Sequence, residues 1–387
     1  MERFFAPCPR GLEAALAEEL AQVGAADVRA AEGGVAFAGR LELAYHVNLQ
    51  SRLASRLLWE VGRGSYRNEH DIYELAHDLD WPRLFRADRT LRVDVAATRS
   101  PLKSLEFATL RIKDGVCDRH RDAGGARPSI SKECPDVRVH AYLTADQATF
   151  YLDTSGEALF KRGYRRESAE APLRENLAAG LLRLARWQPG IALLDPLCGS
   201  GTIAIEAALI ALDVAPGVRR GFGFQKLSWY DGPTWQRIKQ AAQRSCRPPA
   251  PANIHASDND AAAIAHCEAN IAAAGVAGAI SVRRDDVLTR TAPAESGTIV
   301  SNPPYGARLA DSAALVAFYP RLGDALKQRF AGWSAFLLSG DPRLPKMIGL
   351  KASRRMPLYN GALECRLYEY RLVAGPLRAR AAGATPR

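Results

Sequence analysis

The sequence lacks the features that would assign it to a membrane or to a disulfide-bonded secreted class. It contains no uninterrupted apolar window of about 18 residues, so we expect no transmembrane helix. The N-terminal stretch "MERFFAPCPRGLEAALAEEL" does not have the layout of a signal peptide, because acidic residues interrupt its apolar positions. The seven cysteines are scattered without a CxxC pair, which argues against a zinc site and a disulfide framework. We therefore expect reduced thiols, no bound metal and a cytoplasmic location.

The charge of the chain is basic and unevenly distributed. The formal net charge of the 387 residues is +10, of which residues 167–387 carry +9. The apolar fraction of 47% and the charged fraction of 24% are those of a globular protein. A basic excess in one half is compatible with a polyanionic partner, although it does not identify one.

The first 157 residues alternate helix and strand patterns and predict two small α+β units, 1–65 and 66–157. In the first unit we expect helices over 9–25 and 41–61 with a hairpin around Glu32-Gly33-Gly34 between them. In the second unit the expected elements are two helices, one strand and a strand-turn-strand pair, over 70–85, 105–121, 90–100 and 137–156. A charged connector broken by Pro172 follows, and we place a linker at 158–170.

From residue 171 the pattern becomes a regular alternation of strands and helices. Such alternation predicts an α/β fold with a parallel, doubly wound sheet over 171–375. Ligands of these sheets bind outside the carboxyl ends of the strands. The last residues, 376–387, are basic and are predicted to be disordered.

The first strand end with polar residues lies in "LLDPLCGSGT", residues 193–202. Asp195 ends an apolar run, and Gly199 and Gly201 allow a tight turn and a close approach of ligand to backbone. The helix that follows would present its amide donors to that ligand. An ordinary strand-to-helix turn capped by Thr202 is the alternative. The lysine of a P-loop and the GxGxxG of a dinucleotide site are both absent.

The second strand end is "HASDND", residues 255–260. A carboxylate at Asp258 can accept both hydroxyls of a ribose, whereas Asp258 or Asp260 could instead cap the next helix. Residues 213–253 separate this acid from the glycine turn, far more than the ~20 residues of a compact dinucleotide unit. Because this insertion is basic and contains tryptophan, we expect it to be an elaboration over the site.

The third strand end, "VRRDDVL", carries Asp285 and Asp286. One of these carboxylates could accept a hydrogen bond from the exocyclic amine of adenine. The alternative is a solvated acidic turn that pairs with Arg283 or Arg284.

The fourth strand end is "SNPPYG", which contains Asn302, Pro303, Pro304 and Tyr305. The two prolines make the loop stiff, so that the Asn302 side-chain oxygen and the Pro303 carbonyl become two fixed acceptors. Two acceptors can hold the hydrogens of an aromatic NH2 group and direct its lone pair at an electrophile. Tyr305 offers a ring on which a base can stack. A Pro-Pro turn without function is the alternative.

The motifs "DPLCGSGT", "SDND" and "SNPPYG" together resemble the class I S-adenosylmethionine-dependent amino-group methyltransferases. The resemblance extends over nearly the whole chain to the THUMP-containing RNA guanine-N2 methyltransferases. It rests on "PCPRGLEAALAEEL", "EGGVAFAG", "NLQSRLASRLL", "DVRVHAYL", "LDTSGEALFKRGYR", "APLRENLAA" and "WQPG". Within that family the chain is most similar to the N-terminal half of the bacterial 23S rRNA (guanine-N2)-methyltransferases.

This resemblance implies a ferredoxin-like domain at 1–65, a THUMP RNA-binding domain at 66–157 and a Rossmann-like methyltransferase domain at 171–375. It implies S-adenosylmethionine as cofactor, with Asp258 and Asn259 at the ribose and Asp285, or Asp286 in its place, at the adenine. The implied catalytic residues are Asn302, Pro303, Pro304 and Tyr305, and Asn302 also borders the cofactor. The implied cofactor loop comprises Asp195, Pro196, Gly199, Ser200, Gly201 and Thr202.

The implied reaction is N2-methylation of a guanosine in structured RNA, with 23S rRNA favoured, as part of ribosome biogenesis. A tRNA substrate, an adenine-N6 DNA methyltransferase and a glutamine-amide protein methyltransferase remain as alternatives. A non-catalytic RNA-binding assembly factor is a further alternative, of a different class. The oligomeric state is left open, and we expect neither a membrane nor a metal among the partners.

Overall fold

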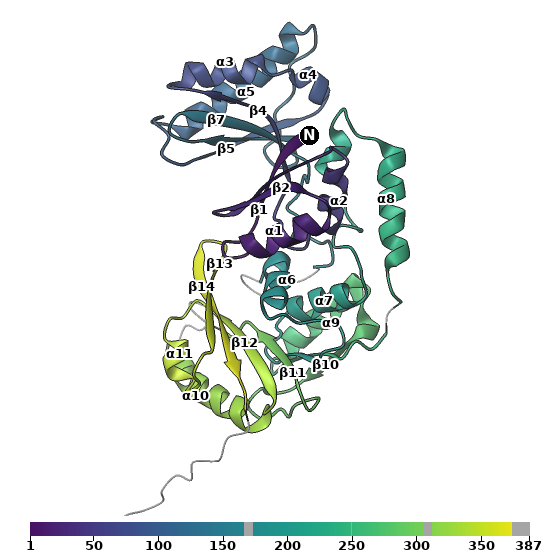
Figure 1. Ribbon diagram of the computed structural model, residues 1–387, viewed down its shortest axis with the longest axis vertical. Coiled ribbons are helices and arrows are strands. Elements are labelled where there is room, and N and C mark those ends of the chain that lie inside the picture. The colour runs from purple at the N-terminus through teal and green to yellow at the C-terminus, as the bar shows by residue number, and fades with distance from the viewer. Residues whose placement is uncertain (166–172, 249, 305–311, 374–387) are drawn as a thin grey trace, which may run out of the picture.

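The computed structural model describes residues 1–165, 173–248, 250–304 and 312–373, and its strands form two seven-stranded sheets. In Figure 1 the N-terminal sheet occupies the upper part of the molecule and the C-terminal sheet the lower part. The predicted tail 376–387 and the end of the predicted linker lie outside the described residues.

The N-terminal sheet has the strand order β2-β3-β1-β4-β7-β6-β5. Its strands are β1 (Glu2–Pro7), β2 (Ala26–Ala31), β3 (Gly34–Gly39), β4 (Leu58–Ser65), β5 (Leu91–Ala97), β6 (Val137–Leu143) and β7 (Gln147–Asp153). Its helices are α1 (Glu13–Gln22), α2 (Leu43–Gln50), α3 (Glu69–Asp78), α4 (Trp81–Leu84) and α5 (Leu105–Asp122). Strand β4 joins the two predicted α+β units, because Trp59 pairs with Phe4 of β1 on one side and with Leu152 of β7 on the other.

The predicted helix over 41–61 is wrong in its second half. Helix α2 ends at Gln50, and an irregular segment then leads into β4. The carboxylate of Glu19 accepts hydrogen bonds from the Ser51 hydroxyl and from the backbone N–H groups of Arg52 and Leu53, at 3.2 and 3.5 Å for the two amides. A tertiary contact therefore replaces the helical hydrogen bonds that the local sequence pattern favours.

The C-terminal sheet has the order β10-β9-β8-β11-β12-β14-β13, and β8 to β12 are parallel. Its strands are β8 (Leu193–Asp195), β9 (Ile254–Asp258), β10 (Ile280–Arg284), β11 (Gly297–Ser301), β12 (Trp333–Ser339), β13 (Arg354–Asn360) and β14 (Leu363–Arg371). Its helices are α6 (Glu175–Leu184), α7 (Thr202–Ala211), α8 (Gly232–Ser245), α9 (Ala261–Ala274), α10 (Ser312–Arg329) and α11 (Leu344–Met347), with the 3-10 turns η1 (Gly223–Lys226) and η2 (Ala277–Ala279).

Neighbouring residues of each parallel strand point into different cores. Leu193 and Val300 belong to the core that includes α6 and α7, whereas Leu194 and Ile299 belong to the core that includes α10 and α11. This arrangement of helices on both faces confirms the predicted doubly wound α/β fold. The antiparallel β13–β14 hairpin at the sheet edge was not predicted.

The insertion 213–253 does not lie over the strand ends as predicted. Instead it packs against the N-terminal half, where the ring of Tyr45 on α2 lies 4.8 Å from Phe224, 5.1 Å from Trp229 and 5.9 Å from Trp235. The Tyr45 hydroxyl also accepts a hydrogen bond of 2.8 Å from the backbone N–H of Asp231. Figure 1 shows α8 beside α2 of the N-terminal half. The aromatic residues of the insertion thus connect the two halves.

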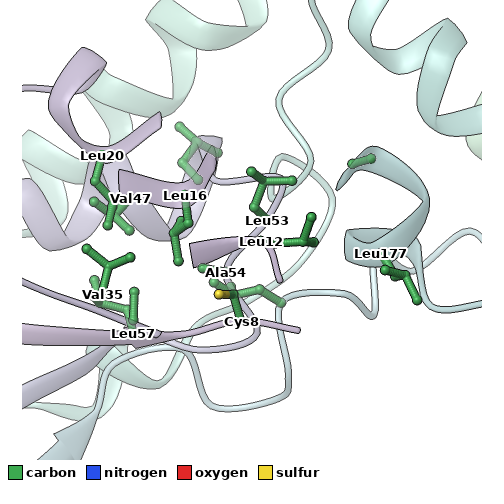
Figure 2. Packing of buried hydrophobic residues seen from close by; sticks show 14 of the residues in the cluster. Cys8, Leu12, Leu16, Leu20, Val35, Val47, Leu53, Ala54, Leu57 and Leu177 are labelled. Carbon is green, nitrogen blue, oxygen red and sulfur yellow. The ribbon is translucent and has the colours of Figure 1, made fainter. Parts of the chain in front are cut away.

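One hydrophobic core runs through both halves. Figure 2 shows Leu12, which precedes α1, next to Leu177 of α6, and both side chains are buried. Gly180 permits this approach, since a Cβ atom there would lie 2.4 Å from a methyl group of Leu12. The described part of the predicted linker is also packed: Arg162 is 3% exposed, donates to the Arg52 carbonyl at 2.6 Å and pairs with Glu206 of α7 at 3.4 Å.

We expect Phe224→Ala to lower the free energy of unfolding by about 3–5 kcal/mol, because it empties the centre of the aromatic contact between the halves. Urea denaturation of the full chain measures this change. Phe107→Ala is the matched control, since Phe107 is 50% exposed whereas Phe224 is fully buried. Equal effects of the two substitutions would show that the insertion does not stabilise the contact between the two halves.

Candidate active site

The strand order brings the four predicted strand ends together at one edge of the C-terminal sheet. Strands β10, β9, β8 and β11 are consecutive neighbours and parallel, so their carboxyl ends lie side by side. Asp285, Asp258, Asp195 and Asn302 therefore follow one another along this edge, although up to 107 sequence positions separate them.

Asp195 is the buried centre of this edge, with an exposure of 2%. The Ser301 hydroxyl donates to Asp195 Oδ1 at 2.7 Å, and the Leu197 N–H lies 3.4 Å from the same atom. Burial raises the pKa of Asp195 to about 7, although the Ser301 hydrogen bond opposes the shift. Asp195 thus links the start of the glycine loop to the residue before Asn302.

The glycine loop has the backbone conformation that its sequence predicts. Gly199 and Gly201 have φ angles of 51° and 80°, a region that residues with a Cβ atom rarely adopt. A Cβ atom at Gly201 would also lie 2.5 Å from the Cys267 sulfur. Gly201 is the N-cap residue of α7, so Thr202 begins the helix and does not cap it. The amide donors of the first turn of α7 consequently open toward the loop.

Asp258 is bonded to the glycine loop, and the neighbouring acid is the helix cap. The Gly199 N–H donates to Asp258 Oδ2 at 3.0 Å, whereas Asp260 Oδ1 accepts from the Ala262 N–H at 2.9 Å as the N-cap of α9. Asp258 is half-buried, and Asn259 beside it is exposed. Asp260 therefore takes the capping role that the sequence left open between the two acids.

At the third strand end the two acids, Asp285 and Asp286, also have different partners. Asp285 Oδ2 pairs with Arg290 Nη1 at 3.2 Å, while Asp286 Oδ1 accepts from the Leu288 N–H at 2.9 Å and closes a turn. The alternative pairing with Arg283 or Arg284 does not appear among the ion pairs of the described residues, where Asp285 pairs with Arg290. Arg290 is 5% exposed, burial lowers its pKa, and its Nε finds no acceptor in the described part of the chain. No sequence pattern distinguished this arginine from the others.

The fourth strand end presents an acceptor without a donor. Asn302 Oδ1 is buried, and the described residues offer it no hydrogen-bond partner. Pro303 is buried, and the Pro304 carbonyl accepts a hydrogen bond of 2.9 Å from the hydroxyl of Tyr319 on α10. Tyr319 was not predicted, because its position on α10 is an ordinary core position by periodicity. Tyr305 lies outside the described residues.

Some kinds of site are not found in the parts of the chain that the structure covers. No group of three or more His, Cys, Asp or Glu residues that could hold a metal ion occurs among the described residues. None of the described helices is long and apolar enough to cross a bilayer. A cavity of about 420 Å³ between the two halves, lined in part by Gln22, Arg183 and Ser245, does not include the strand ends.

Residues 162–369 match the family model described as "RMKL-like, methyltransferase domain". The chain belongs to this methyltransferase family. Two further models match the N-terminal half: "RlmL ferredoxin-like domain" over residues 3–58 and "THUMP domain" over residues 66–153. The family resemblance stated from the motifs is thereby confirmed.

The curated relatives are longer than this chain. A protein of Shewanella frigidimarina named "Ribosomal RNA large subunit methyltransferase K/L" is 40% identical over 98% of this chain and 54% of its own length. A protein of the same name from Aeromonas hydrophila is 38% identical over 96% of this chain and 55% of its own length. The chain thus spans about half the length of the curated relatives it matches.

Several solved structures resemble nearly the whole chain. SMU.472, a candidate methyltransferase complexed with SAH, has a TM-score of 0.87 at 29% identity and covers 96% of this chain and 98% of its own. A predicted N6-adenine-specific DNA methylase from Listeria monocytogenes has a TM-score of 0.86 at 31% identity and covers 95% and 96% of the two chains. The arrangement of both sheets is therefore shared with known methyltransferase-like structures.

The burial of Asp195 generates a prediction about pH. Its folded-state pKa of about 7 exceeds its ordinary value of 3.8, so the native state retains a proton that the unfolded state releases. The contribution of Asp195 to the free energy of unfolding should fall as the pH rises from about 4 to about 7. Asp195→Asn removes this contribution, at most about 4 kcal/mol, and should be more stable relative to wild type at pH 8 than at pH 4. Urea unfolding of both chains at the two pH values measures the difference, and parallel changes would contradict the assignment.

Proposed function

We propose that this chain is an S-adenosylmethionine-dependent methyltransferase that methylates N2 of a guanosine in structured RNA, with 23S rRNA as the favoured substrate. The observation that carries this proposal is the buried, unpartnered Asn302 Oδ1 at the carboxyl edge of the sheet. A buried acceptor without a donor costs free energy, so its retention at a strand end fits a substrate N–H as the missing partner.

The loop around Asn302 has the chemistry for holding an exocyclic amine. Asn302 Oδ1 and the Pro303 carbonyl would accept the two amine hydrogens and direct the nitrogen lone pair away from the ring. Tyr319 holds the Pro304 carbonyl, and Ser301 is held by Asp195, so the loop is fixed on both sides. Tyr305 would supply the surface on which the base, extruded from its stack, is placed.

The residues at the edge of the sheet fit S-adenosylmethionine. Asp258 lies next to the glycine loop and would accept the ribose hydroxyls, with Asn259 beside it, and Asp285 would accept from the adenine amine. We prefer Asp285 to Asp286 because the Asp286 carboxylate folds back onto its own turn. Asp195, Pro196, Gly199, Ser200, Gly201 and Thr202 would surround the amino-acid end. The cofactor, when bound, supplies an electrophilic methyl group on a sulfonium centre.

RNA is the favoured substrate because of the N-terminal half. A THUMP model matches residues 66–153, and the curated relatives are named for large-subunit rRNA. A cytoplasmic location and a role in ribosome biogenesis belong to the same proposal. The name of the Listeria structure keeps adenine-N6 methylation of DNA as the second candidate.

The direct test is methyl incorporation by the purified chain from radiolabelled S-adenosylmethionine into rRNA, tRNA, DNA and protein. Mass spectrometry of the modified nucleosides then identifies the base. We expect N2-methylguanosine in 23S rRNA. N6-methyladenine in DNA, with unmodified RNA, would refute the proposal in favour of the second candidate.

Asn302→Ala should reduce methyl transfer about a hundredfold to a thousandfold, because it removes one of the two acceptors that orient the amine. The affinity for S-adenosylhomocysteine, measured by calorimetry, should stay within about threefold of wild type. Wild-type activity of this variant would contradict the role of Asn302.

Tyr319→Phe should lower the rate of transfer about tenfold without changing cofactor affinity, because the Pro304 carbonyl loses its only described side-chain donor. Tyr370→Phe is the matched control: Tyr370 is equally buried, but its hydroxyl makes no hydrogen bond to another described residue. Equal rates in the two variants would show that Tyr319 does not position the loop.

A further inference from the structure

Arg165 lies between the connector and the glycine loop. Its Nη1 donates to the Ser200 hydroxyl at 3.2 Å and its Nη2 to the Thr202 hydroxyl at 3.1 Å. The same guanidinium pairs through Nε with Glu175 of α6 at 2.9 Å and donates to the Leu173 carbonyl at 3.1 Å. One side chain from outside the Rossmann-like motif therefore contacts two hydroxyls of the loop.

Burial and several hydrogen bonds restrain the position of this guanidinium. The side chain of Arg165 is 20% exposed and that of Glu175 is 6% exposed. Burial raises the pKa of Glu175, and the Arg165 charge opposes that shift. Four of the five N–H donors of Arg165 have acceptors among the described residues, so the planar group cannot rotate without losing several hydrogen bonds.

The contacts with Arg165 also determine how the two hydroxyls act. An arginine is only a donor, so the oxygens of Ser200 and Thr202 must accept from it, and their own hydrogens point elsewhere. Thr202 begins α7, and Ser200 directly precedes the N-cap residue Gly201. At this end of the helix the backbone N–H groups lack partners in the helix and the helix dipole is positive. The loop thus presents hydroxyl and amide donors beside a cation, which favours an anionic ligand group.

The order of the strands indicates which ligand group arrives there. If the adenine lies at Asp285, which follows β10, and the ribose at Asp258 of β9, the remaining part of the ligand extends toward β8. The reacting methyl must face Asn302, which follows β11 on the far side of β8, so the amino-acid end is left for the start of α7. The anionic part of that end is its carboxylate.

We propose that Arg165 is a positioning residue that makes the glycine loop selective for the ligand's carboxylate, acting through the Ser200 and Thr202 hydroxyls. This inference rests on the proposed function, because it assumes S-adenosylmethionine as the ligand. It adds Arg165 of the connector to the residues that shape the cofactor loop.

The test compares S-adenosylhomocysteine with its decarboxylated amine analogue, which lacks only the carboxylate. Calorimetry of the full wild-type chain should show a preference for S-adenosylhomocysteine. In Arg165→Gln the affinity for S-adenosylhomocysteine should fall about tenfold, while the affinity for the analogue should stay within about twofold of wild type. The preference for S-adenosylhomocysteine should therefore also fall by nearly tenfold. Arg165→Lys, which keeps the charge without the planar fork, should retain part of the preference.

Arg183→Gln is the matched control, since Arg183 of α6 forms an ion pair with Glu18 at the surface and should affect neither affinity. Equal losses for both ligands in Arg165→Gln would indicate a merely structural role and overturn the inference. An unchanged preference would overturn it as well. Failure of the wild-type chain to bind either ligand would instead overturn the proposed function, and the inference with it.

Discussion

The parallel pairing of β8 with β9 and β11 is the constraint on which the whole site depends. This pairing sets Asp195 opposite Ala256 and Ile299 opposite Leu194, so the polar residue that follows each strand emerges at the same edge. Asp195 then connects two loops through Ser301, and Gly199 connects to Asp258. A shift of one residue in either pairing would exchange the two faces of the strand and move Asp195 out of its buried position.

The two halves of the molecule are joined by a packed interface rather than by a free linker. The aromatic residues of the insertion, the Leu12–Leu177 contact and the Arg162–Glu206 pair all lie between them. Removing one partner of a buried ion pair costs about 3–5 kcal/mol, so this pair makes the contact costly to disrupt. Under the proposed function, the N-terminal half would bind the RNA, and its packing against the C-terminal half would help determine which nucleotide reaches Asn302.

The predictions from local sequence patterns were correct where a segment had a clear helical or strand periodicity. They were wrong where contacts with residues distant in sequence determine the local structure. The parallel strands and their glycine turn were predictable, because short apolar runs ending in Asp or Gly have a consistent local meaning. The helix over 41–61 was overpredicted, since no local signal reveals the carboxylate of Glu19 that satisfies Arg52 and Leu53. The prediction that the insertion lies over the site was wrong, because composition does not reveal which surface its tryptophans contact.

The sequence by itself determined the doubly wound fold, the methyltransferase family and the small set of residues from which a site could be built. These follow from periodicity and from motifs whose members are close together in the chain. Only the tertiary structure decided that Asp260 caps α9 while Asp258 binds the glycine loop, and that Arg165 and Tyr319 support that edge. The physical reason is that a hydrogen bond depends on distance and direction in space, which the order of residues along the chain does not specify.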